Sequence, residues 1–351
     1  MVHLRSMIKD SSSVSRGEEV ADKAHSRSGV GVVIWNVTYD CNMRCLHCYQ
    51  SEWRPTKELS DFNEFSRIID QLEELGKPLI FISGGEPLLK DQTFQLIREL
   101  KARDFRVILS TNGSLSGALQ SVADSLDNIA LPLYGPEGFH DTLTGVEGSY
   151  NSVINALRNL RGASLTIKTV ASRSVLKHLH YLLDVASRYD VSTLYICDLL
   201  PEGRAQSSSE ILSKEEWRKL LDFLLQEVII EERYGEIEID IGLHPSAAIY
   251  SSMRAGFRAN RRIMREGRGL ISISPTGDTL LSPYLGDLRI GDARKLKEAL
   301  ESDIYKRVGD ARNLKGRCGD CIFKEICGGS RVKAYVYSGD LFGEDPTCLI
   351  N

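Results

Sequence analysis

The sequence has no hydrophobic run as long as the roughly 20 residues that a membrane-spanning helix needs. It also has no excess of basic residues, because 44 Lys and Arg stand against 48 Asp and Glu and the formal net charge is -4. A chain of this charge is not expected to require a nucleic acid as its partner. The N-terminus lacks the apolar core of a signal peptide, so we expect a cytoplasmic protein.

The composition is that of a globular protein, with 42% hydrophobic and 26% charged residues in a chain of 351. This length suits a large α/β domain with a smaller second part. Residues 1–28 are rich in Ser and charged residues and have no sustained periodicity, so we predict a mobile leader there.

Short apolar segments alternate with amphipathic segments from about residue 30 onward. Because parallel strands need crossover connections, this pattern predicts a parallel sheet with helices on its outside. Six βα units fall short of the eight of a closed barrel. We therefore predict an α/β fold with a partial (β/α)6 TIM-type barrel over 29–235 and a small cysteine-rich module over 236–351. The six expected strands are 32–38, 79–83, 106–110, 128–133, 165–171 and 193–199, followed by a helix over 213–233, a strand over 236–243 and a hairpin of 270–274 with 279–281.

Three cysteines lie close together after the first expected strand. Cys41, Cys45 and Cys48 have the spacing Cys-x3-Cys-x2-Cys, at the end of a strand where parallel α/β folds place their active sites. Three thiolates on a compact loop can ligate three irons of a cubane and leave the fourth iron open to a chelating ligand. A structural zinc site needs four closed ligands, and His47 is poorly placed as the fourth.

The segment 41–49, CNMRCLHCY, resembles the signature of the radical S-adenosylmethionine (SAM) superfamily. The resemblance implies that Cys41, Cys45 and Cys48 hold a catalytic 4Fe–4S cluster whose open iron chelates SAM. Reductive cleavage of SAM then yields a 5′-deoxyadenosyl radical that abstracts hydrogen from the substrate. It also implies that backbone groups around His47 contact the adenine, and that an electron donor such as ferredoxin or flavodoxin is a partner.

The second expected strand ends in Ser-Gly-Gly-Glu-Pro at 83–87. Paired glycines permit a close backbone approach to a ligand, and a proline can begin a helix. The segment resembles the Gly-Gly-Glu-Pro motif of the same superfamily, which binds the SAM amino group. The fourth strand ends in Pro-Leu-Tyr-Gly where relatives often have Ser-Leu-Asp-Gly, so no ribose contact is carried over. The residues that the resemblance implies for cofactor binding are His47, Gly84, Gly85, Glu86, Pro87 and Asn112.

A second set of cysteines lies near the C-terminus, and four thiols are a complete ligand set for one cubane or one zinc ion. Their spacing, Cys-x2-Cys-x5-Cys with a final cysteine, resembles the auxiliary-cluster motif of SPASM and twitch modules. Arg331 and Ser282 stand where the full SPASM pattern has further cysteines. The resemblance therefore implies one auxiliary 4Fe–4S cluster. Its ligands would be Cys318, Cys321, Cys327 and Cys348, while the remaining cysteine, Cys197, is expected to be a buried inert thiol.

The segments 198–205 and 328–346 resemble the haem-biosynthesis branch of the superfamily, which trims propionate or acetate side chains from sirohaem-derived tetrapyrroles. The resemblance implies an oxidative enzyme with a tetrapyrrole substrate. Arg204 and the arginines of 254–268 could form ion pairs with the carboxylates of that substrate. The Leu-Tyr-Gly at 133–135 is more similar to peptide-modifying members, so a peptide or protein maturase is an alternative. A non-catalytic iron–sulfur or zinc-organised binding protein is a further alternative.

Overall fold

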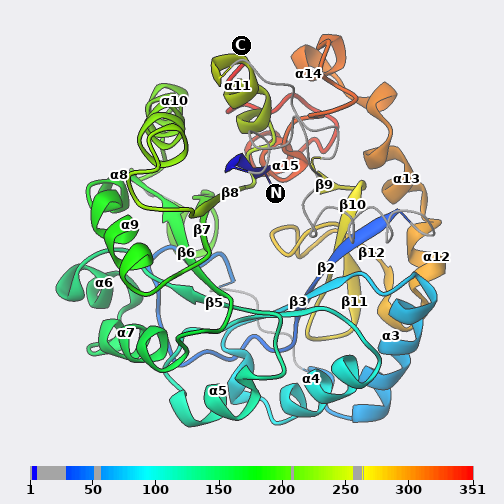
Figure 1. The fold of residues 1–351 in the computed structure, drawn as a ribbon. Helices are drawn as coiled ribbons and strands as arrows, with labels where there is room; N and C mark the ends of the chain where they lie inside the picture. The colour runs from blue at the N-terminus through cyan, green and yellow to red at the C-terminus, as the bar shows by residue number, and fades with distance from the viewer. Residues whose placement is uncertain are drawn as a thin grey trace.

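The computed structural model describes residues 2–5, 29–50, 57–206, 209–255, 263 and 265–350. Its central feature is one sheet with the strand order β1-β8-β7-β6-β5-β4-β3-β2-β10-β11-β12, in which β9 pairs with β10. The sheet is curved, and α3 to α9 lie on its outside (Figure 1). No helix in the described part of the chain is long and apolar enough to cross a membrane.

The six expected barrel strands are all present, and adjacent ones pair in parallel. The prediction of a partial TIM-type barrel is confirmed. Two strands have the expected bounds, three differ by one residue at one end, and β2 begins and ends two residues earlier than expected. Their bounds are β2 Val30–Asn36, β3 Leu79–Ser83, β4 Val107–Ser110, β5 Asn128–Pro132, β6 Leu165–Ala171 and β7 Thr193–Asp198.

The sheet continues beyond the six strands at both ends. The expected strand near residue 240 is β8, Glu238–Gly242, and it adds in parallel to β7. At the other end β10, Gly269–Ile273, pairs in parallel with β2 and forms the expected hairpin with β11, Asp278–Leu280. Strands from residues after 235 thus extend the six-stranded sheet at both of its ends, and the division at 235/236 stays a prediction. The remaining strands are β9 Arg265–Glu266 and β12 Arg289–Asp292.

The expectation of a mobile leader over 1–28 is wrong for residues 2–5. The short strand β1, Val2–His3, pairs antiparallel with β8, and Leu4 and Arg5 are buried. Arg5 donates to the carbonyl oxygens of Ile237, at 2.7 Å, and Val228, at 2.9 Å. A buried guanidinium that satisfies carbonyls at the sheet edge holds this segment in place. Residues 6–28 lie outside the described residues.

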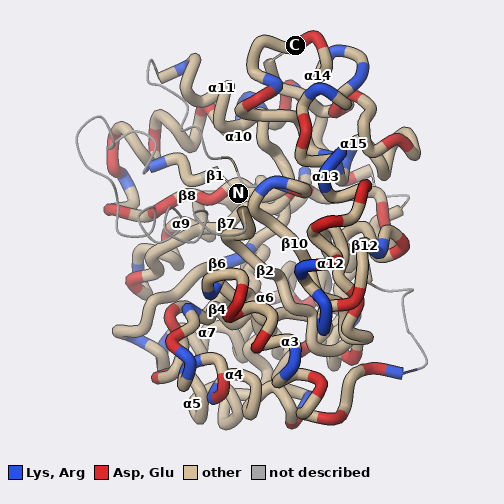
Figure 2. The backbone as a smooth tube through the Cα atoms, turned by 90° about the vertical axis from the view of Figure 1, so that its right-hand side faces the viewer, with Lys and Arg blue, Asp and Glu red and all other residues tan. Residues whose placement is uncertain are grey.

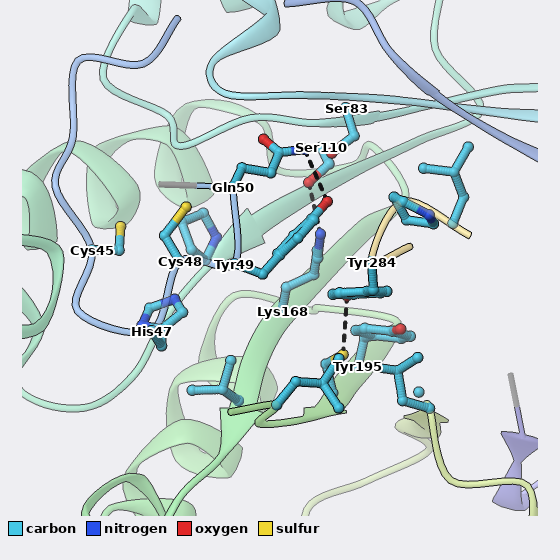
Figure 3. A pocket seen from close by; sticks show the side chains of 18 of the residues that line it. Cys45, His47, Cys48, Tyr49, Gln50, Ser83, Ser110, Lys168, Tyr195 and Tyr284 are labelled. Carbon is cyan, nitrogen blue, oxygen red and sulfur yellow. Dashed lines mark hydrogen bonds between the residues drawn. The ribbon is translucent and has the colours of Figure 1, made fainter. Parts of the chain in front are cut away.

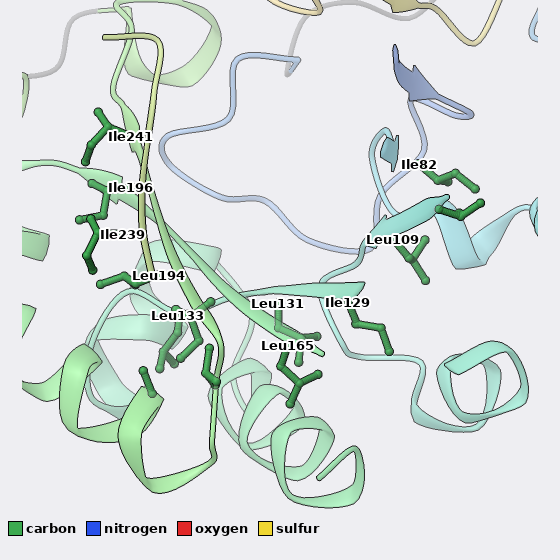
Figure 4. Close-up of a cluster of buried hydrophobic side chains, with 14 of the residues drawn as sticks. Ile82, Leu109, Ile129, Leu131, Leu133, Leu165, Leu194, Ile196, Ile239 and Ile241 are labelled. Atoms are coloured by element: carbon green, nitrogen blue, oxygen red, sulfur yellow. The ribbon is translucent and has the colours of Figure 1, made fainter. Parts of the chain in front are cut away.

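The core lies between the sheet and the outer helices. The apolar side chains of the barrel strands are packed together there, as Figure 4 shows for Ile82, Leu109 and Leu131. Acidic and basic residues are interspersed on outer helices such as α3, α4 and α12 (Figure 2). The helices of the barrel are α3 Phe62–Glu74, α4 Gln92–Ala102, α5 Ser116–Ala123, α6 Glu137–Thr144, α7 Ser149–Asn159, α8 Arg173–Leu176 and α9 Leu179–Arg188, with the 3-10 turns η1 Pro87–Leu89 and η2 Gly203–Ala205.

The expected helix over 213–233 begins with a capping box. The Ser213 hydroxyl accepts a hydrogen bond from the Glu216 backbone N–H at 3.2 Å, and the Glu216 carboxylate accepts one from the Ser213 N–H at 2.8 Å. The helix differs from the prediction after ten residues, because α10, Lys214–Phe223, continues as the π-helix η3, Leu224–Ile230.

The C-terminal helices α14 and α15 lie near the open side of the barrel between β8 and β10 (Figure 1). A second apolar cluster, which includes Leu200 after β7 and Val332 of α15, joins this part to the barrel. The other helices here are α11 Ser246–Ala255, α12 Leu296–Leu300, α13 Asp303–Gly309, α14 Gly316–Asp320 and α15 Arg331–Ser338, with the 3-10 turns η4 Ala293–Lys295 and η5 Ala311–Asn313.

A buried ion pair ties α15 to the barrel. Lys333 Nζ lies 2.9 Å from Asp198 Oδ2 at the end of β7, and both side chains are buried. The Trp217 indole N–H donates to the other carboxylate oxygen at 3.1 Å. Breaking such a pair leaves one buried charge without compensation.

We expect Lys333→Met to lower the free energy of unfolding by about 3–5 kcal/mol, because Asp198 would stay buried and unpaired. The matched control is Lys297→Met, which removes an exposed pair with Glu74 and is expected to cost less than about 1 kcal/mol. Denaturant titrations of the wild type and both variants measure the difference. Equal losses in the two variants would contradict a stabilising role of the buried pair.

Candidate active site

A cavity of about 340 Å³ opens at the C-terminal ends of the barrel strands. Its wall contains all three cysteines of the loop after β2, together with residues from the loops after β3 and β4. Residues of the C-terminal part complete the wall. Of the predicted cluster and cofactor residues, Cys41, Cys45, His47, Cys48, Gly84, Gly85 and Asn112 line this cavity, whereas Glu86 and Pro87 do not.

The cysteine loop is held in place by backbone and arginine contacts. The Leu46 N–H donates to the carbonyl oxygen of Leu143, near the end of α6, at 2.8 Å. The Arg204 Nε donates to the Cys45 carbonyl oxygen at 2.6 Å, and the Arg204 backbone N–H donates to the Cys48 carbonyl oxygen at 3.1 Å. Arg204 was expected to pair with substrate, but in this structure it positions the cysteine loop.

Desolvation makes two of the loop thiols, Cys41 and Cys45, poor acids. Desolvation raises the pKa of Cys45 to about 12 and raises the pKa of Cys41 as well. A bound iron centre would stabilise the thiolates that burial disfavours. No three His, Cys, Asp or Glu side chains of the described residues are arranged around one metal ion. In a cubane each thiolate binds a different iron, so the wider spread of three loop thiols is compatible with it.

The two glycines after β3 allow that loop to contact the cysteine loop directly. Gly84 has φ +143, and a Cβ there would lie 2.4 Å from the Thr38 carbonyl oxygen. A Cβ on Gly85 would lie 2.1 Å from the Asp40 carbonyl oxygen. The Gly85 N–H donates to the Thr38 carbonyl oxygen at 2.7 Å. We had expected these glycines to approach a ligand, and the structure shows that they also approach the backbone before Cys41.

We therefore expect Gly85→Ala to displace the cysteine loop, because the added methyl group overlaps a backbone oxygen that no side-chain rotation can move. The cost is about 3 kcal/mol, with loss of iron from the first cluster. Gly138→Ala in α6 is the matched control, since nothing lies within 4 Å of its added Cβ. Thermal unfolding and iron analysis of the anaerobically reconstituted variants measure both effects, and equal iron contents would contradict the prediction.

Glu86 is completely buried and faces the neighbouring loop instead of the cavity. Its carboxylate accepts hydrogen bonds from the Thr111 hydroxyl at 2.7 Å and from the Asn112 N–H at 2.6 Å. Glu86 thus positions Asn112 in this structure, and its role toward SAM stays a prediction. Asn112 lines the cavity and donates to the Asn42 side chain at 2.7 Å. Pro87 begins the 3-10 turn η1.

His47 lies on the cavity wall as a neutral imidazole. Its Nε2 is 2.9 Å from the Tyr134 hydroxyl, and its Nδ1 has no partner among the described residues. Burial and the nearby charge of Arg204 lower the pKa of His47 to about 4. The predicted contact of backbone groups around His47 with the adenine stays a prediction. Tyr134 also lines the cavity.

Several cavity residues were not predicted from the sequence. Tyr49, Tyr195 and Tyr284 form an aromatic wall opposite the cysteines, and Lys168 projects between them toward Ser110 (Figure 3). The Lys168 Nζ donates to the Ser110 hydroxyl at 2.9 Å. Burial lowers the pKa of this amine. Tyr284 lies between β11 and β12, far along the chain from the barrel strands, and no sequence motif marks it.

Cys197 is buried as expected, and it also lines the cavity. Its Sγ lies 3.4 Å from the Tyr284 hydroxyl. Ser282, which stands where an upstream cysteine of the full SPASM pattern was expected, also lines this cavity.

The four C-terminal cysteines line a second, small cavity together with Gly328 and Gly329. Backbone N–H groups donate to three of the sulfurs: Asp345 to Cys318 at 3.3 Å, and Phe323 to Cys321 and Gly329 to Cys327 at 3.4 Å. Such bonds favour the thiolate form that iron binds. The donor set therefore fits one auxiliary cubane.

Arg331, which stands where the full SPASM pattern has a further cysteine, lies beside one of the four cysteines. Its side chain is fully buried, and its Nη1 donates to the carbonyl oxygens of Leu341, at 2.9 Å, and Gly343, at 2.6 Å. Its Nη2 lies 3.7 Å from the Cys318 sulfur. A cation at this position stabilises negative charge on that sulfur.

Residues 35–178 match the model of the radical SAM superfamily. This part of the chain is a radical SAM domain, and the protein is an enzyme. Enzymes of this superfamily use a 4Fe–4S cluster and SAM, and the matched region contains the cysteine loop and the glycine motif of the cavity. The radical SAM enzyme described here also has the second cysteine set that SPASM-type relatives use for auxiliary clusters.

Two curated relatives of this radical SAM enzyme cover most of its length. The AdoMet-dependent heme synthase of Methanosarcina barkeri is 25% identical over 91% of this chain and 96% of its own. The mycofactocin maturase MftC of Mycolicibacterium smegmatis is 27% identical over 90% of this chain and 81% of its own. Among solved structures, Streptococcus suis SuiB bound to the precursor peptide SuiA has a TM-score of 0.74 at 16% identity, covering 95% of this chain and 79% of SuiB. The SuiB match shows the fold alone.

Proposed function

We propose that this radical SAM enzyme removes or modifies carboxylate side chains of a tetrapyrrole in haem biosynthesis, by an oxidative reaction. In this proposal Cys41, Cys45 and Cys48 ligate the SAM-binding cluster within the barrel domain, 29–235. The auxiliary cluster belongs to the domain 236–351. Its ligands are Cys318, Cys321, Cys327 and Cys348.

The observation that carries the proposal is the match to a haem synthase over nearly the whole length of both chains. The basic side chains of Lys168, Arg204 and Arg265 line the cavity wall, together with the acidic Glu266 and with Asp198, which pairs with Lys333. A tetrapyrrole with acetate or propionate side chains needs such partners when it is taken out of water. The aromatic wall of Tyr49, Tyr195 and Tyr284 supplies flat apolar surface for a large ring.

In this proposal each part of the site has its own role in the reaction. When bound, the first cluster and SAM supply the 5′-deoxyadenosyl radical that abstracts hydrogen from the substrate. Arg204 holds the cysteine loop through its carbonyl oxygens. An oxidation also requires that an electron leave the substrate, and Arg265 connects the cavity to the loop after Cys327. We further propose a cytoplasmic location and a ferredoxin or flavodoxin as electron donor.

The test uses the full chain, reconstituted anaerobically with iron and sulfide and reduced with dithionite. With SAM and an iron tetrapyrrole that carries propionate groups, we expect 5′-deoxyadenosine together with a product that has lost carbon dioxide and two hydrogen atoms for each propionate converted to a vinyl group. Chromatography and mass spectrometry measure both. Formation of 5′-deoxyadenosine without any change in the tetrapyrrole would reject the tetrapyrrole as substrate but not the radical chemistry.

A peptide is the second candidate substrate. The match to a mycofactocin maturase over 90% of this chain favours it. The same reaction is run with the short peptides encoded beside the gene, and a peptide whose mass changes only with SAM and reductant would support this alternative. Absence of 5′-deoxyadenosine under every condition would instead support a non-catalytic binding protein.

A further inference from the structure

Arg265 differs from the other described arginines of the basic run near residue 260. Arg254 forms an exposed ion pair with Asp222, and Arg268 forms one with Glu325. Arg265 belongs to β9, is 2% exposed and lines the main cavity. Arg258, Arg261 and Arg262 lie outside the described residues. Arg265 is thus the member of this run that the structure places at the cavity.

The guanidinium of Arg265 is fixed along one side and unpaired along the other. Its Nη1 donates to the backbone carbonyl oxygens of Glu266, at 3.3 Å, and Val308, at 3.2 Å. Its Nε and Nη2 are buried and have no hydrogen-bond partner. Within the described part of the chain Arg265 also forms no ion pair. The two free N–H groups form the edge of a guanidinium that binds a carboxylate through two parallel hydrogen bonds.

Burying a cation without a counter-ion costs free energy. The Nε and Nη2 edge of Arg265 is therefore expected to bind an anion. Burial lowers the pKa of Arg265 only to about 10, so the side chain remains charged at neutral pH. The other two cavity cations already have partners. Lys168 donates to Ser110, and Arg204 donates to the Cys45 carbonyl oxygen.

Arg265 also contacts the auxiliary-cluster loop. A Cβ on Gly328, the residue after Cys327, would lie 2.6 Å from both Cζ and Nε of Arg265, and Gly328 has φ +63. Only a glycine allows the guanidinium to pack against this loop so closely. Arg265 therefore contributes to the wall of the cavity while touching the loop that holds a proposed auxiliary ligand.

We infer that Arg265 anchors a carboxylate of the substrate through its Nε and Nη2 groups, and thereby places that side of the substrate against the Cys327–Gly328 loop. This inference rests on the proposed function and adds the residue that orients the substrate. Its consequence is that the substrate group nearest the anchor has the shortest path for electron transfer to the auxiliary site.

The test compares binding of coproporphyrin III with binding of its methyl ester, which keeps the ring but removes the negative charges. Fluorescence quenching of the metal-free porphyrins by the reconstituted holoenzyme gives the affinities. The variants are Arg265→Gln, Arg265→Lys and the matched control Arg268→Gln. The control removes a positive charge that lies three residues along the chain from Arg265 and does not line the cavity. Iron content per chain shows that both clusters are present, and the midpoint potential of the auxiliary cluster is recorded for each protein.

We expect Arg265→Gln to weaken binding of the free acid about tenfold or more and to leave binding of the ester nearly unchanged. Arg265→Lys is expected to lie between the wild type and Arg265→Gln, and Arg268→Gln to match the wild type. Equal affinities of the wild type and Arg265→Gln for the free acid would overturn the inference while leaving the proposed function intact. A changed auxiliary-cluster potential with unchanged affinity would also overturn it, since Arg265 would then serve the charge of the cluster.

A wild-type enzyme that binds neither porphyrin would reject the tetrapyrrole substrate, and the inference with it. The Arg265→Gln comparison distinguishes the two failures, because only a wild type that binds the acid can show a loss of selectivity for it.

Discussion

Replacing Cys45 with alanine is expected to lower formation of 5′-deoxyadenosine by about a thousandfold or more, to the level without enzyme. Cys45 is one of the three loop thiols on the cavity wall, and a cubane with only two protein ligands in this loop would not be retained. Anaerobic reconstitution, dithionite reduction and chromatography of the SAM products measure the loss.

The matched control is Cys197→Ala, which removes a thiol from the same cavity but not from the cysteine loop. We expect this variant to keep the iron content of the wild type and to form 5′-deoxyadenosine. If Cys45→Ala retained both its iron and SAM cleavage, the assignment of the loop as the radical site would be wrong.

Replacing Cys327 with alanine is expected to separate the two halves of the reaction. The wild type should contain about eight irons per chain and the variant about four, because one cubane loses a ligand. SAM cleavage is expected to continue, since Cys327 lines the second cavity and not the first. Conversion of the substrate is expected to fall by at least about a hundredfold, because the electron released by oxidation has no acceptor.

Iron analysis, electron paramagnetic resonance and mass spectrometry of the substrate measure these effects. About four irons in the wild type would contradict the second cluster. Full substrate conversion by Cys327→Ala would contradict its role as electron acceptor, even if the cluster itself were confirmed.

Local patterns were sufficient for the barrel strands. Strand β3 is short, largely apolar and followed by two glycines, while β6 alternates apolar with polar residues, and both patterns are typical of strands. The capping box at Ser213 was readable for the same reason, since its partners are three residues apart. The strand β1 was missed, because two residues acquire strand structure only through pairing with β8.

The site residues, like the strands, were predictable where they belong to one short motif and not where they depend on contacts with another segment. The cysteine loop and the Gly84–Gly85 pair are contiguous motifs, and both line the cavity as expected. Glu86 belongs to the same motif, yet its carboxylate is turned toward Thr111 and Asn112. Its orientation depends on donors from the next loop, which no spacing within the motif specifies.

The sequence by itself determined the chemistry of this protein, because iron ligands and the glycine turn beside them must be close along the chain and therefore leave a short signature. It also determined the order of the barrel strands. Only the tertiary structure decided what faces the cavity from a distance: Lys168 from β6, Arg265 from β9 and Tyr284 from the segment after β11. Their meeting depends on sheet closure and on the docking of the C-terminal part, which are long-range contacts without a local pattern.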